Sequence, residues 1–182
     1  MNIFSSPPVY ISKLRLDRGI ARCQMVLHND RSLYLFKAFF YFIYYTGIYK
    51  REFKSLTWDK IDLERNRAFL SNRIIYFPDK VKNLLVSYRQ VFPNEERFLD
   101  LNEYDIEHIF GALNRGVPRN KRISIENMRT SFFVMCVKKR VPMEIMMKLM
   151  GALSPFVPYW YYYHCAKITD EMVEKIYKKK IK

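Results

Sequence analysis

Residues 33–49 are nearly all apolar or aromatic. A helix that is apolar on all sides is either buried in a protein core or crosses a membrane. This stretch is slightly short for a membrane span, contains Lys37, and continues directly into Lys50 and Arg51. We therefore predict a buried core helix over residues 32–45. Thr46-Gly47 should end or kink it, because glycine tolerates the left-handed conformation that closes helices.

A β-hairpin is indicated further along the chain. Residues 67–70 and 73–77 are two runs of β-type residues that flank the short polar turn Ser71-Asn72. Ahead of them, the alternation of Ile61 and Leu63 predicts the start of another strand. The sequence therefore predicts one small antiparallel sheet.

The remaining apolar residues recur mostly at helical spacing. Further helices are predicted over residues 50–56, from Asp79, from Asn102 to Leu113, from Ser124, from Pro142 to Met150, and from Thr169. The fold class predicted is mainly α with a small antiparallel β-hairpin or sheet (α+β). Residues 1–30 are expected to run over the surface as an extension before a single domain at 31–182. The same periodicity predicts these core residues: Leu35, Phe39, Phe42, Ile43, Leu56, Trp58, Leu84, Ile109, Phe132 and Leu149.

The charge balance changes the functional picture. The 182 residues include 32 Lys and Arg against 18 Asp and Glu, so the formal net charge is +14. Such a field attracts polyanions, which favours nucleic acid or an anionic membrane surface as partner. The alternative is a basic protein without a nucleic acid partner.

Cysteine usage and the N-terminus indicate the compartment. The three cysteines lack disulfide-framework spacing, and the N-terminus lacks the charged and apolar regions of a signal peptide. We expect an intracellular protein in a reducing compartment, the cytoplasm or the nucleoid or nucleus. The Cys and His pairs lack zinc-site spacing, so neither a metal site nor a cofactor is expected.

Three blocks of sequence resemble one known family. Residues 46–62 resemble the segment T-G-L-R-x-S-E-L-x-x-L-x-W-x-D-I-D that opens the tyrosine recombinase (phage integrase) catalytic domain. Residues 126–132 are similar to H-x-L-R-H-S-F, and residues 145–151 to the helix that ends in L-L-G-H. Tyr161 follows Gly151 by ten residues, where the family's nucleophile lies. The resemblance covers roughly residues 30–165 and implies the catalytic domain without the core-binding domain that usually precedes it.

The resemblance implies a chemistry and a set of residues for it. Family members attack a DNA phosphodiester with a tyrosine hydroxyl and form a 3′-phosphotyrosine, assisted by two arginines, a hairpin lysine and one or two histidines. Arg129 matches the second arginine, whereas Tyr49, Glu126 and Ala152 stand where the first arginine and the two histidines would be. The candidate catalytic residues are Arg129, the nucleophile candidates Tyr161 and Tyr162, and the substitute cations Arg51 and Arg73.

Each of these assignments has a simpler alternative. Arg129 could be a surface arginine of a helix, Arg73 a solvated strand residue, and Glu126 an acid favoured by the dipole at a helix start. The aromatic run around Tyr161 could be core or partner packing rather than chemistry.

The prediction is a DNA-binding protein of the tyrosine recombinase family whose strand cleavage is weak or lost. One alternative is an active, divergent recombinase that forms a 3′-phosphotyrosine, and a second is a non-catalytic interaction protein within a larger complex. The expected partners are double-stranded DNA and a second copy or partner recombinase on that DNA, and not a membrane. The residues expected to contact DNA are Lys50, Arg51, Arg73, Arg119, Lys121, Arg122 and Arg129.

Overall fold

The computed structural model describes residues 8–26, 30–154 and 156–165 of the chain. Its helices are α1 (Lys13–Val26), α2 (Asp30–Thr46), α3 (Lys50–Lys54), α4 (Asp79–Val91), α5 (Glu103–Leu113), α6 (Ile125–Lys138), α7 (Met143–Met150) and α8 (Phe156–Cys165). The strands are β1 (Ile61–Asp62), β2 (Arg67–Phe69) and β3 (Ile74–Tyr76), and short 3-10 turns cover Trp58–Lys60, Phe98–Asp100 and Arg119–Lys121. The predicted class, mainly α with a small antiparallel sheet, is confirmed. The helix expected from Thr169 lies outside the described residues.

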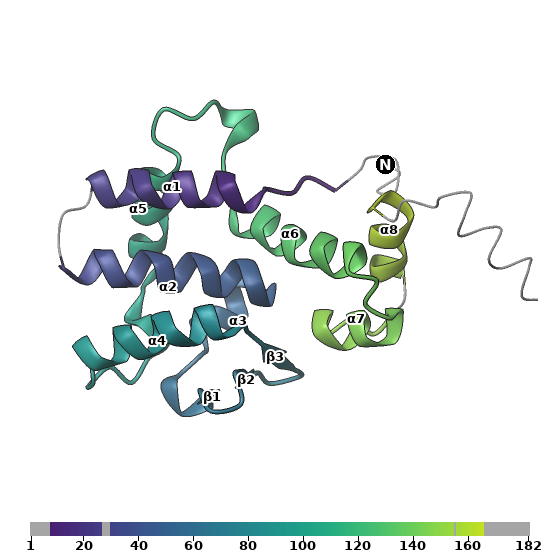
Figure 1. Cartoon of the computed structure of the whole chain (residues 1–182), viewed down its shortest axis with the longest axis horizontal. Helices are drawn as coiled ribbons and strands as arrows, with labels where there is room; N and C mark the ends of the chain where they lie inside the picture. Colours follow the sequence, from purple (N-terminus) through teal and green to yellow (C-terminus); the bar gives the residue numbers. More distant parts are fainter. Residues whose placement is uncertain (1–7, 27–29, 155, 166–182) are drawn as a thin grey trace, which may run out of the picture.

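Helix α2 is the centre of the molecule. It lies between α1 and α4 and also packs against α6, which leads away from this body to α7 and α8 (Figure 1). Phe39, Phe40 and Phe42 on α2 are fully buried. The predicted core helix is therefore confirmed, and among the described residues no helix has the length and apolar content needed to cross a bilayer.

The three strands form an antiparallel sheet in the order β1-β2-β3. Ala68 pairs with Ile61 on one side and with Ile75 on the other. Side chains alternate along β3 and its ends, so that Arg73, Ile75 and Phe77 are buried while Ile74 and Tyr76 are exposed. The hairpin around Ser71-Asn72 is confirmed, with Arg73 on its inner face.

Capping residues define the ends of α5, α6 and α7. Ser124 accepts a hydrogen bond from the Asn127 backbone N–H at the start of α6, and Asn102 caps α5 in the same way. Gly151 closes α7 with a φ of 64°, in the left-handed region that glycine adopts without strain.

Eight of the ten predicted core residues are buried, whereas Leu84 and Leu149 are half-buried at the edge of the core. The core has two parts. The larger one surrounds α2, and the smaller one joins α6 to α7 and α8.

The expectation that residues 1–30 run over the surface is wrong for α1. Leu16, Ile20 and Cys23 on this helix belong to the same core as α2. Just before the helix, the Ile11 backbone N–H donates to the Ser131 hydroxyl of α6 at 2.9 Å. The helix thus covers the core because its apolar residues share one face.

Candidate active site

The candidate site gathers around the turn between α2 and α3. Gly47 takes a φ of 63° there, and Tyr49 precedes the first residue of α3 in an extended conformation. The Glu52 carboxylate accepts from the Tyr49 backbone N–H at 2.9 Å, which holds the start of the helix. This turn directs the Tyr49 ring toward residues of α6 and the hairpin.

Arg129 of α6 lies directly against this turn. Its Nε donates to the Gly47 carbonyl at 3.1 Å, and its Cζ lies 3.5 Å from the centre of the Tyr49 ring and 5.0 Å from that of Phe133. Burial lowers the pKa of the Arg129 guanidinium, and Tyr49 and Tyr161 partly oppose that shift. Arg129 is therefore a half-buried, oriented cation rather than a solvated surface arginine.

Arg73 is buried, and the alternative of a solvated strand residue is wrong. Its Nη2 and Nε donate to the two carboxylate oxygens of Glu52 at 2.7 and 3.1 Å. The same guanidinium donates to the carbonyls of Gly47 and Leu149. A bidentate ion pair in a buried place needs such additional hydrogen bonds to offset desolvation. Arg73 therefore joins the hairpin, α3 and α7, and its side chain does not reach the surface.

Tyr49 is the common neighbour of three arginines. Besides Arg129, Arg51 and Arg73 place their Cζ atoms 5.4 and 5.7 Å from the centre of the Tyr49 ring. Arg51 itself is exposed. The ring thus fills the centre of a cationic site in which the family resemblance implies an arginine.

Of the two nucleophile candidates, only Tyr161 is brought to Arg129. Tyr161 is buried on α8, its hydroxyl lies 3.5 Å from that of Thr130, and it interacts electrostatically with Arg129. Burial raises the pKa of the Tyr161 hydroxyl, while Thr130 and Arg129 act to lower it. Tyr162 is half-buried, and burial raises the pKa of its hydroxyl, with Cys136 and Glu144 acting in the same direction.

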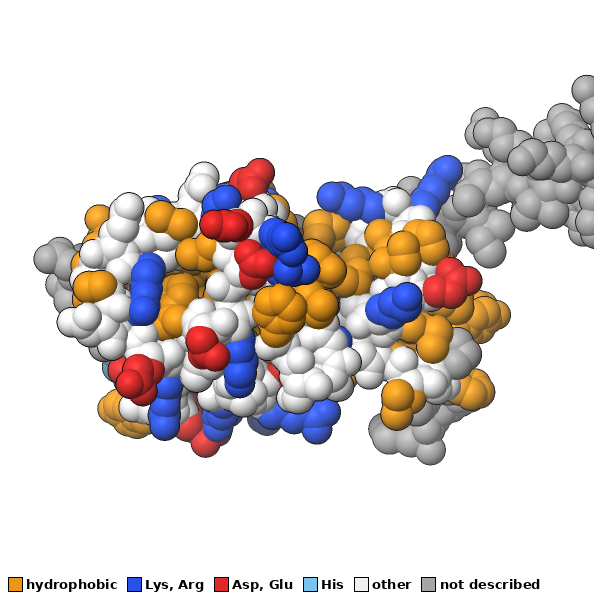
Figure 2. Space-filling view, turned by 90° about the horizontal axis from the view of Figure 1, so that it is seen from below, with side chains coloured by type: hydrophobic (Ala, Val, Ile, Leu, Met, Phe, Trp, Pro, Cys, Tyr) orange, Lys and Arg blue, Asp and Glu red, His pale blue; other side chains and the backbone are white. Residues whose placement is uncertain are grey.

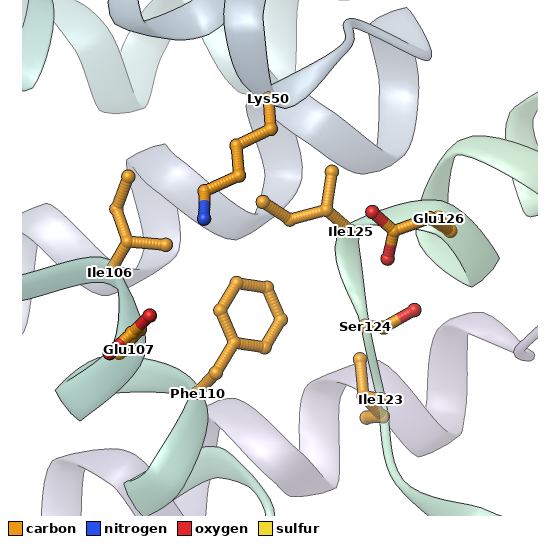
Figure 3. A pocket seen from close by; sticks show the side chains of 8 residues that line it. All are labelled: Lys50, Ile106, Glu107, Phe110, Ile123, Ser124, Ile125 and Glu126. Atoms are coloured by element: carbon orange, nitrogen blue, oxygen red, sulfur yellow. The ribbon is translucent and has the colours of Figure 1, made fainter. Parts of the chain in front are cut away.

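Glu126 and Ala152 stand at the two positions where the family resemblance implies histidines. Glu126 is exposed in the first turn of α6, which agrees with an acid favoured by the helix dipole. It lines a pocket of about 220 Å³ with Lys50, Glu107 and an apolar floor that includes Phe110 (Figure 3). Ala152 is half-buried beside α7 and carries no titratable group.

The other expected DNA contacts lie on the surface. Arg119, Lys121 and Arg122 are exposed on the connection between α5 and α6, which projects beyond α1 in Figure 1. Lys50 is half-buried and pairs with Glu103 at 2.7 Å, as does Lys54 at 3.0 Å. On the face shown in Figure 2, basic side chains are distributed over the whole surface with acidic ones among them.

Sequence reasoning missed the role of the Tyr49 ring, the Gly47 carbonyl and Thr130. The position of Tyr49 between Gly47 and Arg51 was a usable signal, because an aromatic ring beside several arginines favours cation–π contact. Nothing in the sequence indicated that one carbonyl accepts from two arginines. Within the part of the chain that the structure describes, no three or more His, Cys, Asp or Glu residues group as a metal site would require.

Comparison with solved structures decides the fold. XerA recombinase superimposes with a TM-score of 0.69 at 17% identity, covering 98% of this chain and 65% of XerA. The Tn1549 transposon integrase in complex with circular intermediate DNA gives 0.70 at 15% identity, covering 96% of this chain and 68% of that one. The catalytic domain of bacteriophage HP1 integrase gives 0.64 at 14% identity, covering 92% of this chain and 94% of that domain.

The chain has the fold of a tyrosine recombinase catalytic domain. Neither protein-family models nor curated protein sequences match it. The chain spans about two thirds of XerA recombinase but nearly all of the HP1 catalytic domain. Within the tyrosine recombinase fold, Tyr49, Arg129 and Tyr161 come together although they are far apart in the sequence.

Proposed function

We propose that this chain is a DNA-binding protein of the tyrosine recombinase type whose strand cleavage is weak or lost. Two observations support DNA as the partner. The net charge is +14, and proteins that share the fold were solved on DNA, among them XerH site-specific recombinase bound to its difH substrate. Phosphate neutralisation by Lys and Arg supplies most of the sequence-independent affinity for DNA.

The contact between Tyr49 and Arg129 carries the proposal of weak cleavage. Phosphoryl transfer requires fixed cations at the non-bridging oxygens. Tyr49 supplies no charge, and its ring covers one face of the Arg129 guanidinium at 3.5 Å. Arg73 is engaged by Glu52, so it is not available to replace the missing arginine.

The Tyr161 hydroxyl also lacks a base in its hydrogen bond with Thr130 that would accept its proton. Tyrosine hydroxyls have an ordinary pKa near 10, and burial raises that of Tyr161 further. Such a hydroxyl attacks slowly unless a neighbouring base accepts its proton. Thr130 is the hydrogen-bond partner of Tyr161, and a threonine hydroxyl is not a base at neutral pH.

DNA binding is tested by titrating a duplex at several salt concentrations. The proposed contacts are Lys50, Arg51, Arg119, Lys121, Arg122 and Arg129. Arg73, which was also expected to contact DNA, is no longer among them because its side chain is buried. Each phosphate contact should contribute about 0.9 to the slope of log affinity against log salt. Binding that is absent at low salt, or independent of salt, would exclude DNA as the partner.

Cleavage is tested with a nicked duplex that traps a 3′-phosphotyrosine, followed by denaturing electrophoresis. We expect no covalent adduct with the natural sequence. Tyr49→Arg together with Ala152→His restores the first arginine and one of the histidines that the family resemblance implies. An adduct with this double variant alone would show that only those groups were lost.

An active, divergent recombinase is the second candidate, and the position of Tyr161 beside Arg129 favours it. Its signature is an adduct formed by the natural sequence and lost in Tyr161→Phe, while Tyr162→Phe keeps it. That result would replace our proposal of weak cleavage.

A non-catalytic interaction protein is the third candidate. A groove of about 780 Å³ between the hairpin and α7 favours it, because the exposed apolar residues Ile74, Tyr76, Ile145 and Leu153 line it. This candidate gains support only if the protein does not bind duplex DNA at low salt.

A further inference from the structure

Two lysines lie over the ring of one buried tyrosine, and a third precedes that tyrosine by one helical turn, away from the candidate active site. Lys13 comes from α1, Lys37 from α2 and Lys80 from the first turn of α4, and all three are exposed. The Lys80 Nζ lies 4.4 Å and the Lys13 Nζ 5.8 Å from the centre of the Tyr41 ring. Lys37 precedes Tyr41 by four residues on α2, which places both on one face of the helix. We call Lys13, Lys37 and Lys80 the lysine cluster.

The cluster has more positive charge than its carboxylate neutralises. Asp17 accepts from the Lys13 Nζ and from the Tyr41 hydroxyl, both at 2.5 Å. Within the described part of the chain, no ion pair joins Lys37 or Lys80 to a carboxylate. The Lys13 and Lys80 ammonium groups both lie over the Tyr41 ring, so two cations are placed near each other.

The electrostatic consequence is visible at Lys80. Burial and the charges of Lys13 and Lys37 lower the pKa of the Lys80 ammonium, and Asp17 only partly opposes them. Two like charges held close together destabilise each other. An anion bound between them would relieve this repulsion without any rearrangement of the helices.

The tyrosine gives two of the lysines a common point of contact. Tyr41 is buried, its hydroxyl is fixed by Asp17, and its ring packs beside that of Tyr45. Ammonium groups over an aromatic ring are attracted by the ring face, so two of the lysines are held near one point before any ligand arrives. Such preorganisation lowers the entropic cost of binding.

We propose that Lys13, Lys37 and Lys80 form a second phosphate-binding site, which contacts the backbone of duplex DNA outside the candidate active site. The identity of the ligand as DNA rests on the proposed function, whereas the preference for phosphate rests on the cluster itself. Lysine binds phosphate as a point charge, so three of them need no exact geometry. Lys37 and Tyr41 precede Gly47 on α2 by ten and six residues, or roughly 15 and 9 Å along the axis, a separation that a short duplex spans.

The first test compares two charge-matched triple variants in duplex binding over a range of salt. Lys13→Gln, Lys37→Gln and Lys80→Gln should together lower the slope of log affinity against log salt by about 2 to 3. The control combines Lys60→Gln, Lys139→Gln and Lys148→Gln, which remove the same charge from exposed positions on other elements. This control should change the slope by less than about 1. Equal slopes in the two triple variants would overturn the site, provided that circular dichroism shows both to be folded.

The second test uses a gain of affinity, which a merely structural role would not produce. Asp17→Asn removes the carboxylate that competes with a bound phosphate. Because exposed ion pairs contribute up to about 1 kcal/mol, the variant should bind duplex DNA roughly two- to fivefold more tightly. Unchanged or weaker binding by a folded Asp17→Asn variant contradicts the proposal.

Inorganic tripolyphosphate separates failure of the site from failure of the proposed function. In amide NMR spectra of the full chain, it should shift resonances around Lys13, Lys37 and Lys80, and these shifts should vanish in the cluster variant. If these shifts occur but the natural sequence binds no DNA, the phosphate site stands and the proposed function fails. If DNA binds but neither the shifts nor the slope difference occurs, the site fails and the proposed function stands.

Discussion

The Cζ atom of Arg129 lies 3.5 Å from the centre of the Tyr49 ring. The same guanidinium donates to the carbonyl of Gly47, which precedes Tyr49 by two residues. One turn of the chain thus engages this cation through both a ring and a backbone oxygen. The ring covers one face of the guanidinium, and the Gly47 carbonyl accepts from its Nε–H. Both contacts hold Arg129 in place.

Removing the ring should make Arg129 available. Cation–π contacts contribute about 0.5–1 kcal/mol at partly exposed sites, so Tyr49→Ala should tighten duplex binding roughly two- to fivefold. Fluorescence anisotropy with a labelled duplex measures the change. Tyr104→Ala, which removes an exposed tyrosine of α5, serves as the control and should have no effect. Weaker binding by folded Tyr49→Ala would mean that the ring helps to present Arg129.

The buried ion pair between Glu52 and Arg73 should be strongly coupled. Glu52→Gln leaves the Arg73 charge buried without its partner, so the free energy of unfolding should fall by about 3–5 kcal/mol. Adding Arg73→Met should recover part of this loss, because the double variant buries no charge. Urea unfolding of the unsubstituted protein, of Glu52→Gln, of Arg73→Met and of the double variant gives the coupling energy. Asp62→Asn breaks the more exposed pair with Arg67 and should leave the unfolding midpoint nearly unchanged.

Gly47 should not tolerate a side chain. Its φ is 63°, and an added Cβ would lie 2.6 Å from a ring carbon of Phe132. Strained backbone and overpacking together predict that Gly47→Ala costs about 2–5 kcal/mol. Gly111→Ala is the matched control, because Gly111 lies inside α5 with open space around it. Its unfolding free energy should rise by about 0.5–1 kcal/mol, since alanine favours the helix.

Trp58 should contribute strongly to stability. The centre of its ring lies 4.9 Å from the ring centre of Phe98 and 6.2 Å from that of Tyr88, in the larger part of the core. Trp58→Ala should therefore lower the free energy of unfolding by about 3–5 kcal/mol, measured in urea. Tyr163→Ala, at an exposed position of α8, should change it by less than about 0.5 kcal/mol.

The cysteines should react with alkylating agents in a fixed order. Burial raises the pKa of Cys23 to about 12 and that of Cys136 to about 11. Because the thiolate is the reacting form, neither should be alkylated appreciably at pH 8 while the protein is folded. Cys165 is half-buried and should react first, so Cys165→Ser should remove the fast phase seen by mass spectrometry. Fast labelling of Cys23 would show that α1 opens locally.

Much of the fold could be predicted from the sequence, because periodicity, caps and turn residues agree with one another. Helix α2, the hairpin around Ser71-Asn72 and the Ser124 cap were all predicted. Helix α1 was missed although Leu16, Ile20 and Cys23 follow helical spacing. Gly19 inside this segment lowers helix propensity. The structure explains the glycine, because an added Cβ would lie 2.8 Å from a methyl group of Leu113.

The candidate site was predictable in part. The resemblance pointed to Arg129 and Tyr161, and the structure brings these two together. The strand alternation that buries Ile75 and Phe77 also places Arg73 on the inner face, a signal that sequence reasoning did not use. From the sequence, Arg73 is expected to be a substitute catalytic cation, a DNA contact or a solvated strand residue. Its partner, Glu52, lies 21 residues earlier, and spacing alone does not pair residues across elements.

The Gly47 carbonyl, which accepts from both Arg129 and Arg73, makes the placement of two cations depend on the orientation of one peptide plane. A rotation of that plane would displace both guanidiniums together, so the positions of Arg73 and Arg129 depend on each other. Substitutions that alter the backbone of this turn should therefore affect both arginines together. Transplanting this site into another protein of the same fold would require the whole turn from Thr46 to Tyr49, rather than its individual residues.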